Sequence, residues 1–333
     1  MSFIAECYNF KVVKIERFIN PKYHFKHVDI ATKTNSGLEQ RIQLFEPQFN
    51  EDEIHATVER PKDEERMFQE HREKYAGSIH LPEWRKVLLV LHGLNPEINP
   101  RDLEFLATSS YHIQAIRKGM ADDVTPTLTS GLILTNDNKL VYGIRGGKVE
   151  PGTVCIAPAN SCITLPDHVL DRFKGKDILT ANFYAGLADE LGVFPEQLSD
   201  VRLIGYHTDP DFTKATGFVY YARTELSSSQ LAEMHRGAFN VYARARKELE
   251  RHLSPEKAEI KARETIREQG FPNVDAWEHT ALVFVDNQPS SIERIIDARK
   301  IPHNGDEYQL LDIGRAPLIL YSQLNAKGLL PIT

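Results

Sequence analysis

The sequence predicts an α/β protein of two domains, of which the first is the smaller. Runs rich in β-branched residues alternate with helical patterns along the chain, as in sheets that are covered by helices. A polar segment with a proline, residues 121–127, separates two such series. We therefore expect an N-terminal α/β domain over residues 1–125 and a second domain over residues 126–333.

Composition excludes several classes of protein. The chain has 333 residues, 41% hydrophobic and 26% charged, with a formal net charge of −7. No apolar run approaches the roughly 20 residues of a membrane span, and the N-terminus lacks the pattern of a secretory signal. Three scattered cysteines indicate reduced thiols. We expect a cytoplasmic protein without membrane contacts and without dedicated nucleic-acid binding, although a local basic patch is compatible with the charge.

The first domain shows both strand and helix patterns. Runs of apolar and β-branched residues predict strands over residues 10–19, 23–32, 40–45 and 86–91. Charged or capped segments predict helices within residues 51–75, where Pro61 interrupts or starts the helix, and over residues 99–106 and 111–120. The 99–106 helix is expected because Asn99 and Pro100 are typical of a helix start.

One strand in this domain resembles part of a hydrolase. Residues 86–91 are followed by His92 and Gly93, as in the turn before the oxyanion hole of α/β-hydrolases. Such an enzyme also needs a G-x-S-x-G nucleophile elbow, which occurs nowhere in the sequence. A core strand followed by a turn is therefore the better interpretation.

The second domain opens with a predicted hairpin, because residues 136–138 are turn formers that tolerate left-handed backbone. Strands are expected over residues 129–135, 139–145, 153–157, 201–207, 216–222 and 279–285. Helices are expected over residues 182–193, 227–270 and 290–299. The segment at about 227–270 would be a helical insertion, and its alternating charges are typical of a solvated face.

The helix at residues 182–193 is the centre of this domain. At 100° per residue its large apolar side chains share one face, so we expect that face to pack against another part of the protein. Asp189 and Glu190 fall on the opposite side and predict an acidic edge. Gly192 stands just past the end, where a left-handed cap residue is usual.

The order of a hairpin, a glycine-rich stretch, a strand and a helix ending in Glu-Leu-Gly-Val resembles a Nudix domain. That family carries the box G-x5-E-x7-R-E-U-x-E-E-x-G-U, where U is aliphatic. Asp189 and Glu190 match its paired acidic residues, and Asp177 falls at its first Glu. Ala185 and Gly186 occupy the Arg and Glu positions, so the box is degenerate. The resemblance is good over about residues 128–225, looser to about 300, and does not extend to the N-terminal third.

The resemblance implies that residues 126–333 form a Nudix-type α/β/α sandwich with a mixed sheet, preceded by the smaller α/β domain. It also implies hydrolysis of a nucleoside diphosphate-linked compound. Mg²⁺ or Mn²⁺ would neutralise the phosphates and activate the attacking water. Asp189, Glu190 and Asp177 would be metal ligands, and Glu190 would also be catalytic. Arg145 would face the substrate phosphates, and Glu278 would be the general base; a strand-end surface charge and a solvated loop residue are the alternatives for these two.

The degenerate box leaves two functional hypotheses open. One is a metal-dependent hydrolase, and the other is a catalytically inactive Nudix-fold module that binds a nucleotide or a protein partner. A mid-helix glycine costs about 1 kcal/mol relative to alanine. Gly186 therefore indicates either close approach of another group to the helix or simple loss of a metal ligand. A nucleotide-like small molecule is the expected partner, and a homodimer is compatible with the sequence.

Overall fold

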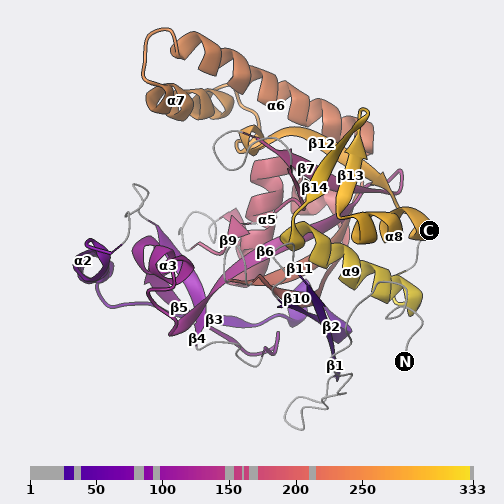
Figure 1. Cartoon of the computed structure of the whole chain (residues 1–333), viewed down its shortest axis with the longest axis horizontal. Helices are drawn as coiled ribbons and strands as arrows, with labels where there is room; N and C mark the ends of the chain where they lie inside the picture. Colours follow the sequence, from indigo (N-terminus) through magenta and orange to yellow (C-terminus); the bar gives the residue numbers. More distant parts are fainter. Residues whose placement is uncertain are drawn as a thin grey trace. The chain divides into compact units, whose positions relative to one another are not determined.

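The computed structural model describes residues 26–33, 39–78, 86–92, 98–146, 154–159, 161–164, 172–209 and 215–330, which contain seven α-helices and 14 strands (Figure 1). The chain forms two compact units. The first draws on residues 1–129, 161–183 and 202–220, and the second on residues 130–160, 184–201 and 221–333. Four elements supply residues to both units: β6 (Val124–Leu134), α5 (Ile178–Leu191), β10 (Leu198–Asp209) and β11 (Ala215–Thr224).

The first unit is built on antiparallel strands with one parallel pair. Its own strands are β1 (Lys26–Lys33), β2 (Glu39–Asn50), β3 (Ala56–Glu59), β4 (Val87–His92), β5 (Leu103–Ser109) and β9 (Ser161–Cys162). β2 pairs antiparallel with β1 and β10, and β4 pairs antiparallel with β5 and with the start of β6. β3 lies parallel to β5. Fully buried aromatic rings, among them Phe105 and Phe218, fill its core.

Two helices of the first unit pack against each other. They are α2 (Glu64–Tyr75) and α3 (Ser110–Arg117), and a short 3-10 turn, η1 (Glu51–Glu53), follows β2. The ring of Phe68 meets that of Tyr111 edge-on, with centroids 5.7 Å apart. His71 and His112 have ring centroids 4.9 Å apart, so imidazoles form part of this helix contact.

The second unit has a mixed sheet around β7. Its strands are β7 (Lys139–Arg145), β8 (Val154–Ile156), β12 (His279–Asp286), β13 (Lys300–His303) and β14 (Asp306–Leu310). β7 pairs antiparallel with β6, β8 and β12, while β14 runs parallel to β8. Parallel and antiparallel pairs thus occur together, and the predicted α/β class with a mixed sheet is confirmed.

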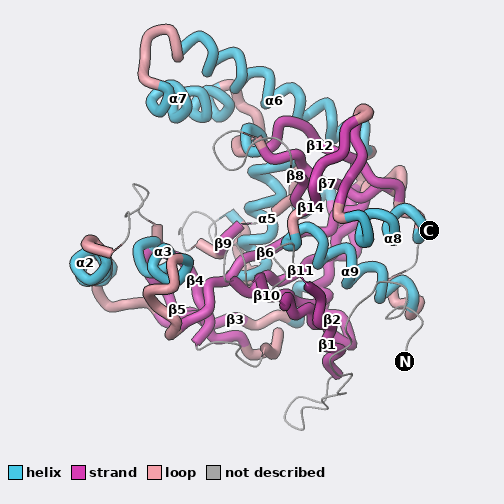
Figure 2. Tube along the Cα trace, viewed as in Figure 1, coloured by secondary structure: helices cyan, strands magenta, loops and turns pink. Residues whose placement is uncertain are grey.

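Helices complete the second unit: α6 (Ser228–Leu249), α7 (Pro255–Glu268), α8 (Pro289–Ala298) and α9 (Asp312–Ala326), with short 3-10 turns η2 (Pro195–Gln197) and η3 (Ala276–Glu278). Figure 2 shows α6 and α7 as an antiparallel pair. Ser227 and Ser254 cap their N-termini, since each hydroxyl accepts from a backbone amide three residues on. No described helix combines the length and apolar character needed to cross a membrane.

Helix α5 is buried on nearly all sides. From Ile178 to Leu191 only Asp189 is partly exposed, so the predicted acidic edge facing away from the core is wrong. The Asp177 carboxylate caps the N-terminus by accepting from the amides of Leu179 (2.8 Å) and Thr180 (3.2 Å). Gly192 ends the helix with φ of +72°, as predicted.

Most predicted elements of the second domain are confirmed. Two predictions earlier in the chain fail, for residues 99–106 and for the connector. Residues 103–109 form β5 rather than a helix, because they pair with β3 and β4. The helix expected within residues 51–75 starts after Pro61, as one of the two predicted alternatives has it: α2 begins at Glu64, and residues 56–59 are strand β3. The connector expected at 121–127 is largely strand, because β6 starts at Val124. The predicted strand at residues 10–19 lies outside the described residues.

Candidate functional site

The candidate site begins where β7 and β12 pair. The first residue of β12, His279, lies opposite Arg145, the last residue of β7. A Cβ placed on Gly143 would stand 2.3 Å from Nδ1 of His279, so the imidazole occupies the space that any other side chain at 143 would need. Glycine at 143 is therefore required for His279 to turn inward.

The inward-facing imidazole meets the carboxylate of Glu190 from helix α5. His279 Nε2 lies 3.1 Å from Glu190 Oε2, and the backbone amide of Ala159 donates to the same oxygen at 3.1 Å. The side chains are 0% and 8% exposed. Glu190 therefore has its carboxylate turned to donors within the protein rather than to solvent.

Burial favours the neutral form of both partners. Burial, and to a smaller extent the neighbouring Asp189, raise the pKa of Glu190 to about 7, against the opposing effects of Arg145 and the Ala159 amide. Burial also lowers the pKa of His279 to about 4, and the positive charge of Arg145 acts in the same direction. Near neutral pH the imidazole is thus uncharged, and one proton lies in the hydrogen bond between the two groups.

The imidazole is only half satisfied. His279 Nδ1 is buried and has no hydrogen-bond partner among the described residues. An unpaired buried polar atom costs about 1–3 kcal/mol.

Arg145 and Glu278 form an ion pair at the edge of the same group. Arg145 Nη1 lies 2.5 Å from Glu278 Oε2, and the side chains are 12% and 26% exposed. The predicted phosphate-binding cation thus already has a carboxylate partner, and the predicted general base is held by an arginine. Both predicted roles stay predictions, but each requires this ion pair to open.

Asp275 links these residues to the end of α5. Its amide donates to the carbonyl of Asp189 at 2.7 Å, and its carboxylate accepts from Trp277 Nε1 at 3.0 Å. Burial raises the pKa of Asp275 to about 6, with further contributions from Glu278, Asp189 and Glu190. Four carboxyl groups therefore lie close enough to influence one another.

Helix α5 and the turn before residue 160 approach each other unusually closely at Gly186. An ideal Cβ on Gly186 would stand 3.0 Å from Cα and 3.1 Å from Cβ of Ala159. Ala159 itself has φ of +54°, in the left-handed region. The prediction that another group approaches the helix backbone at Gly186 is confirmed, and a longer side chain at 186 has no room in this packing.

The structure brings together most of the predicted site residues. Glu190, Asp189, Glu278 and Arg145 lie in one group, although they come from three separate parts of the chain. Asp177 is the N-cap of α5, about 20 Å along the helix from Glu190 at 1.5 Å per residue. Asp177 and Glu190 therefore cannot bind the same ion.

These residues do not fit the metal that the resemblance implies. Where the structure describes the chain, no three His, Cys, Asp or Glu side chains are arranged to hold a metal. The Glu190 oxygen that would be a ligand accepts from Ala159 and faces His279 instead. Gly186 supplies no ligand, and Ala159 occupies the space beside it.

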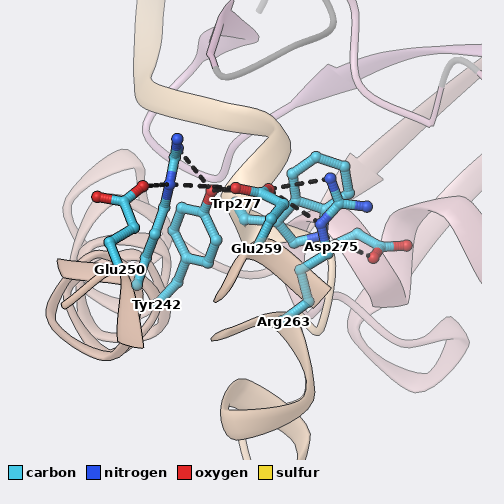
Figure 3. A network of polar contacts seen from close by, with 7 residues as sticks. Tyr242, Glu250, Glu259, Arg263, Asp275 and Trp277 are labelled. Atoms are coloured by element: carbon cyan, nitrogen blue, oxygen red, sulfur yellow. Dashed lines mark hydrogen bonds and ion pairs between the residues drawn. The ribbon is translucent and has the colours of Figure 1, made fainter. Parts of the chain in front are cut away.

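A second polar network holds the segment that carries Glu278 (Figure 3). Its centre is Glu259 on α7, 5% exposed, which accepts from the Tyr242 hydroxyl at 2.8 Å to each oxygen. Arg263 donates to Glu259 Oε1 through Nη2 at 2.9 Å, and its guanidinium carbon lies 3.4 Å from the centroid of the Trp277 ring. Arg246 lies within 3.2 Å of Glu259 and 2.9 Å of Glu250. The helix pair thus anchors η3, directly before His279.

Sequence reasoning missed three members of the site: His279, Asp275 and Ala159. Their roles depend on backbone atoms, burial and chain crossings that no spacing in the sequence encodes. The available signal for His279 was its position at the start of a predicted strand, next to the candidate base Glu278.

Comparison with known proteins adds no family to this description. No protein-family model matches the chain, and a search of curated proteins finds no relative. The geometry of the site therefore carries the functional argument.

Proposed function

We propose that this chain is a catalytically silent Nudix-like module that binds a nucleotide-type ligand without hydrolysing it. The observation that carries the proposal is the state of Glu190. Its carboxyl group is buried and bonded to the Ala159 amide and to His279. The ligand class rests on the resemblance to the Nudix family.

The glycine in the box helix supports the same proposal. In the family's box, position 186 carries a glutamate, whereas here the turn at Ala159 fills the adjacent space. The helix thus has a packing role at the point where the box would supply a metal ligand. Gly186 is explained by this contact as well as by loss of a ligand.

The second candidate is a hydrolase of nucleoside diphosphate-linked compounds that uses Mg²⁺ or Mn²⁺. The observation in its favour is that Asp275 bonds to the backbone of Asp189 and lies near Glu278 and Glu190, whose charges raise its pKa. Hard cations bind carboxylate oxygens, so these groups are the ones that such an enzyme would use. The candidate requires Glu190 to leave His279, and for that reason it ranks second.

A turnover and binding assay separates the two functions. The full chain is incubated with a panel of nucleoside diphosphate-linked compounds and either Mg²⁺ or Mn²⁺, and product release is measured. We expect no release from any compound, together with saturable nucleotide binding in calorimetry. Turnover that disappears in Glu190→Gln would overturn the proposal in favour of the hydrolase. Failure of every nucleotide to bind would also overturn it and would leave a protein partner as the ligand.

A further inference from the structure

The outer face of helix α6 carries four exposed basic side chains. They are Arg236, Arg244, Lys247 and Arg251, and we call them the α6 basic stripe. Relative to Arg236 the other three lie at about 80°, 20° and 60° around the helix at 100° per residue. They therefore share one side, with Asn240 between them and Arg251 in the turn after the helix.

None of the four has an ion-pair partner among the described residues, although the sequence suggests that neighbouring charges cancel. The structure separates those charges. Arg246 turns inward to Glu250 and Glu259, which neutralises the acidic residue closest to the end of the helix. Two exposed acidic residues remain on α6: Glu233, which precedes the stripe, and Glu248, at its margin.

Helix α7 shows that this excess of positive charge is particular to α6. Its exposed charges are balanced, with three acidic and three basic side chains: Glu256, Glu264, Glu268, Lys257, Lys261 and Arg267. The whole chain has a net charge of −7. The basic stripe is therefore a local reversal of sign on an acidic protein, and it creates an attractive potential for anions.

The shape of the stripe favours a linear polyanion. From Arg236 to Arg251 it extends about 22 Å along the helix axis at 1.5 Å per residue. One strand of a nucleic-acid duplex presents about six phosphates over that length. Three of the four cations are arginines, whose forked donors suit phosphate oxygens.

An anionic membrane surface fits this face less well. Helices that lie on membranes combine basic residues with large apolar side chains that enter the lipid. Within the described residues, the exposed large hydrophobic side chains are Met120, Ile260 and Leu329, and none of them is on α6. We propose that the α6 basic stripe binds the phosphate backbone of a nucleic acid, independently of the nucleotide site.

The test measures, by fluorescence anisotropy, how the full chain binds three labelled probes: duplex DNA, duplex RNA and single-stranded RNA. We expect binding at low salt that weakens by up to about 100-fold when salt rises fourfold, as four phosphate contacts imply. The variant R236E/R244E/R251E should bind at least ten-fold more weakly than the wild type. The three probes distinguish DNA from RNA and duplex from single strand.

The matched control changes the same number of charges on the other helix. K257E/K261E/R267E lowers the net charge by the same amount but leaves the α6 basic stripe intact. Its affinity should stay within about three-fold of the wild-type affinity when measured at about 0.1 M salt, where charges are screened over about 10 Å. Unaltered thermal melting of both variants shows that they fold. Absence of binding at low salt, equal losses in both variants, or binding to phosphatidylserine vesicles in place of nucleic acid would each overturn the proposal.

Discussion

The guanidinium of Arg263 stacks on the ring of Trp277, with its central carbon 3.4 Å from the ring centroid. The same guanidinium donates twice to Glu259 Oε1, at 3.1 and 2.9 Å. One side chain of α7 thus satisfies a buried carboxylate and covers the aromatic residue next to Glu278. The helix pair and the candidate site are therefore mechanically connected within the second unit.

Removal of this guanidinium should destabilise the protein. In Arg263→Ala, Glu259 keeps Tyr242 and Arg246 but loses two hydrogen bonds, and Trp277 loses its cover. We expect a decrease of about 1–3 kcal/mol in the free energy of unfolding, measured with urea. Arg267→Ala, one turn later at an exposed position, is the control and should stay within about 0.5 kcal/mol of the wild type. Equal effects in both variants would show that the stacking contributes nothing.

Alanine at position 186 should not give the usual gain in helix stability. In an unobstructed helix interior, a change from glycine to alanine stabilises by about 1 kcal/mol. Here the new Cβ meets the backbone of Ala159 at 3.0 Å, and overpacking typically costs about 1–3 kcal/mol. We expect Gly186→Ala to lower the unfolding free energy by up to about 2 kcal/mol.

The control for that experiment is Gly237→Ala on α6. Its new Cβ would meet only the edge of the Phe271 ring, at 3.1 Å, and a partly buried ring can shift. We expect this variant to be neutral or slightly stabilised in the same urea titration. A gain at position 186 equal to or larger than the gain at position 237 contradicts the close packing at Ala159.

The buried Glu190 should give a distinctive pH dependence. Its pKa rises from 4.5 to about 7 on folding, so the native state loses stability relative to the unfolded chain as pH rises from about 4.5 to 7. Glu190→Gln does not titrate. The stability of the variant relative to the wild type should therefore increase across that window, by at most roughly 3 kcal/mol for the full shift.

The measurement is urea unfolding of both proteins at several pH values. His279 is present in both proteins, so its own titration affects both curves. Glu196→Gln, a change at an exposed position, is the control and should show a stability difference that varies little with pH. A flat difference for Glu190→Gln as well would show that this carboxyl group is ionised normally in the folded protein.

A different acid response is expected at the contact of α2 with α3. His71 Nδ1 and the Ser109 hydroxyl share a hydrogen bond of 2.7 Å. Burial and the neighbouring His112 lower the pKa of His71 to about 4. Lys74 acts in the same direction, while Glu70 and Asp123 oppose it. The contribution of His71 to stability is present above pH 6.5 and is lost as pH falls toward 4.

Hydrogen exchange can locate this response. Amides of α2 should lose protection between about pH 6 and 4, faster than amides of α5, once the intrinsic exchange rates are taken into account. His71→Gln, which keeps a polar side chain but does not titrate, should reduce the acid-induced loss in α2. An unchanged loss in that variant would assign the effect to another group.

The sequence was informative where a local pattern decides the structure. The hairpin at residues 129–145 and the glycine end of α5 follow from residue types at fixed positions. Segment 103–109 behaved differently, because its pairing with β3 and β4 outweighed the helix-start signal at Asn99. Helix α9 was not predicted, since it is buried on most sides and contains Pro317, so it lacks an amphipathic period.

The candidate site was predictable in part for the same reason. Resemblance to the Nudix box suggested Glu190 and Asp189, and resemblance to the same family suggested Arg145 and Glu278. The partners that determine their chemistry could not be predicted, because Ala159 contributes a backbone amide and His279 depends on the absence of a side chain at Gly143.

The contact between Gly186 and Ala159 also limits which sequences this fold can reach by stepwise mutation. A glutamate at 186 has room only if the turn at Ala159 moves. That movement would break the hydrogen bond that the Ala159 amide donates to Glu190. The two positions are therefore coupled: a larger side chain at 186 is tolerated only together with a rearranged turn at 159.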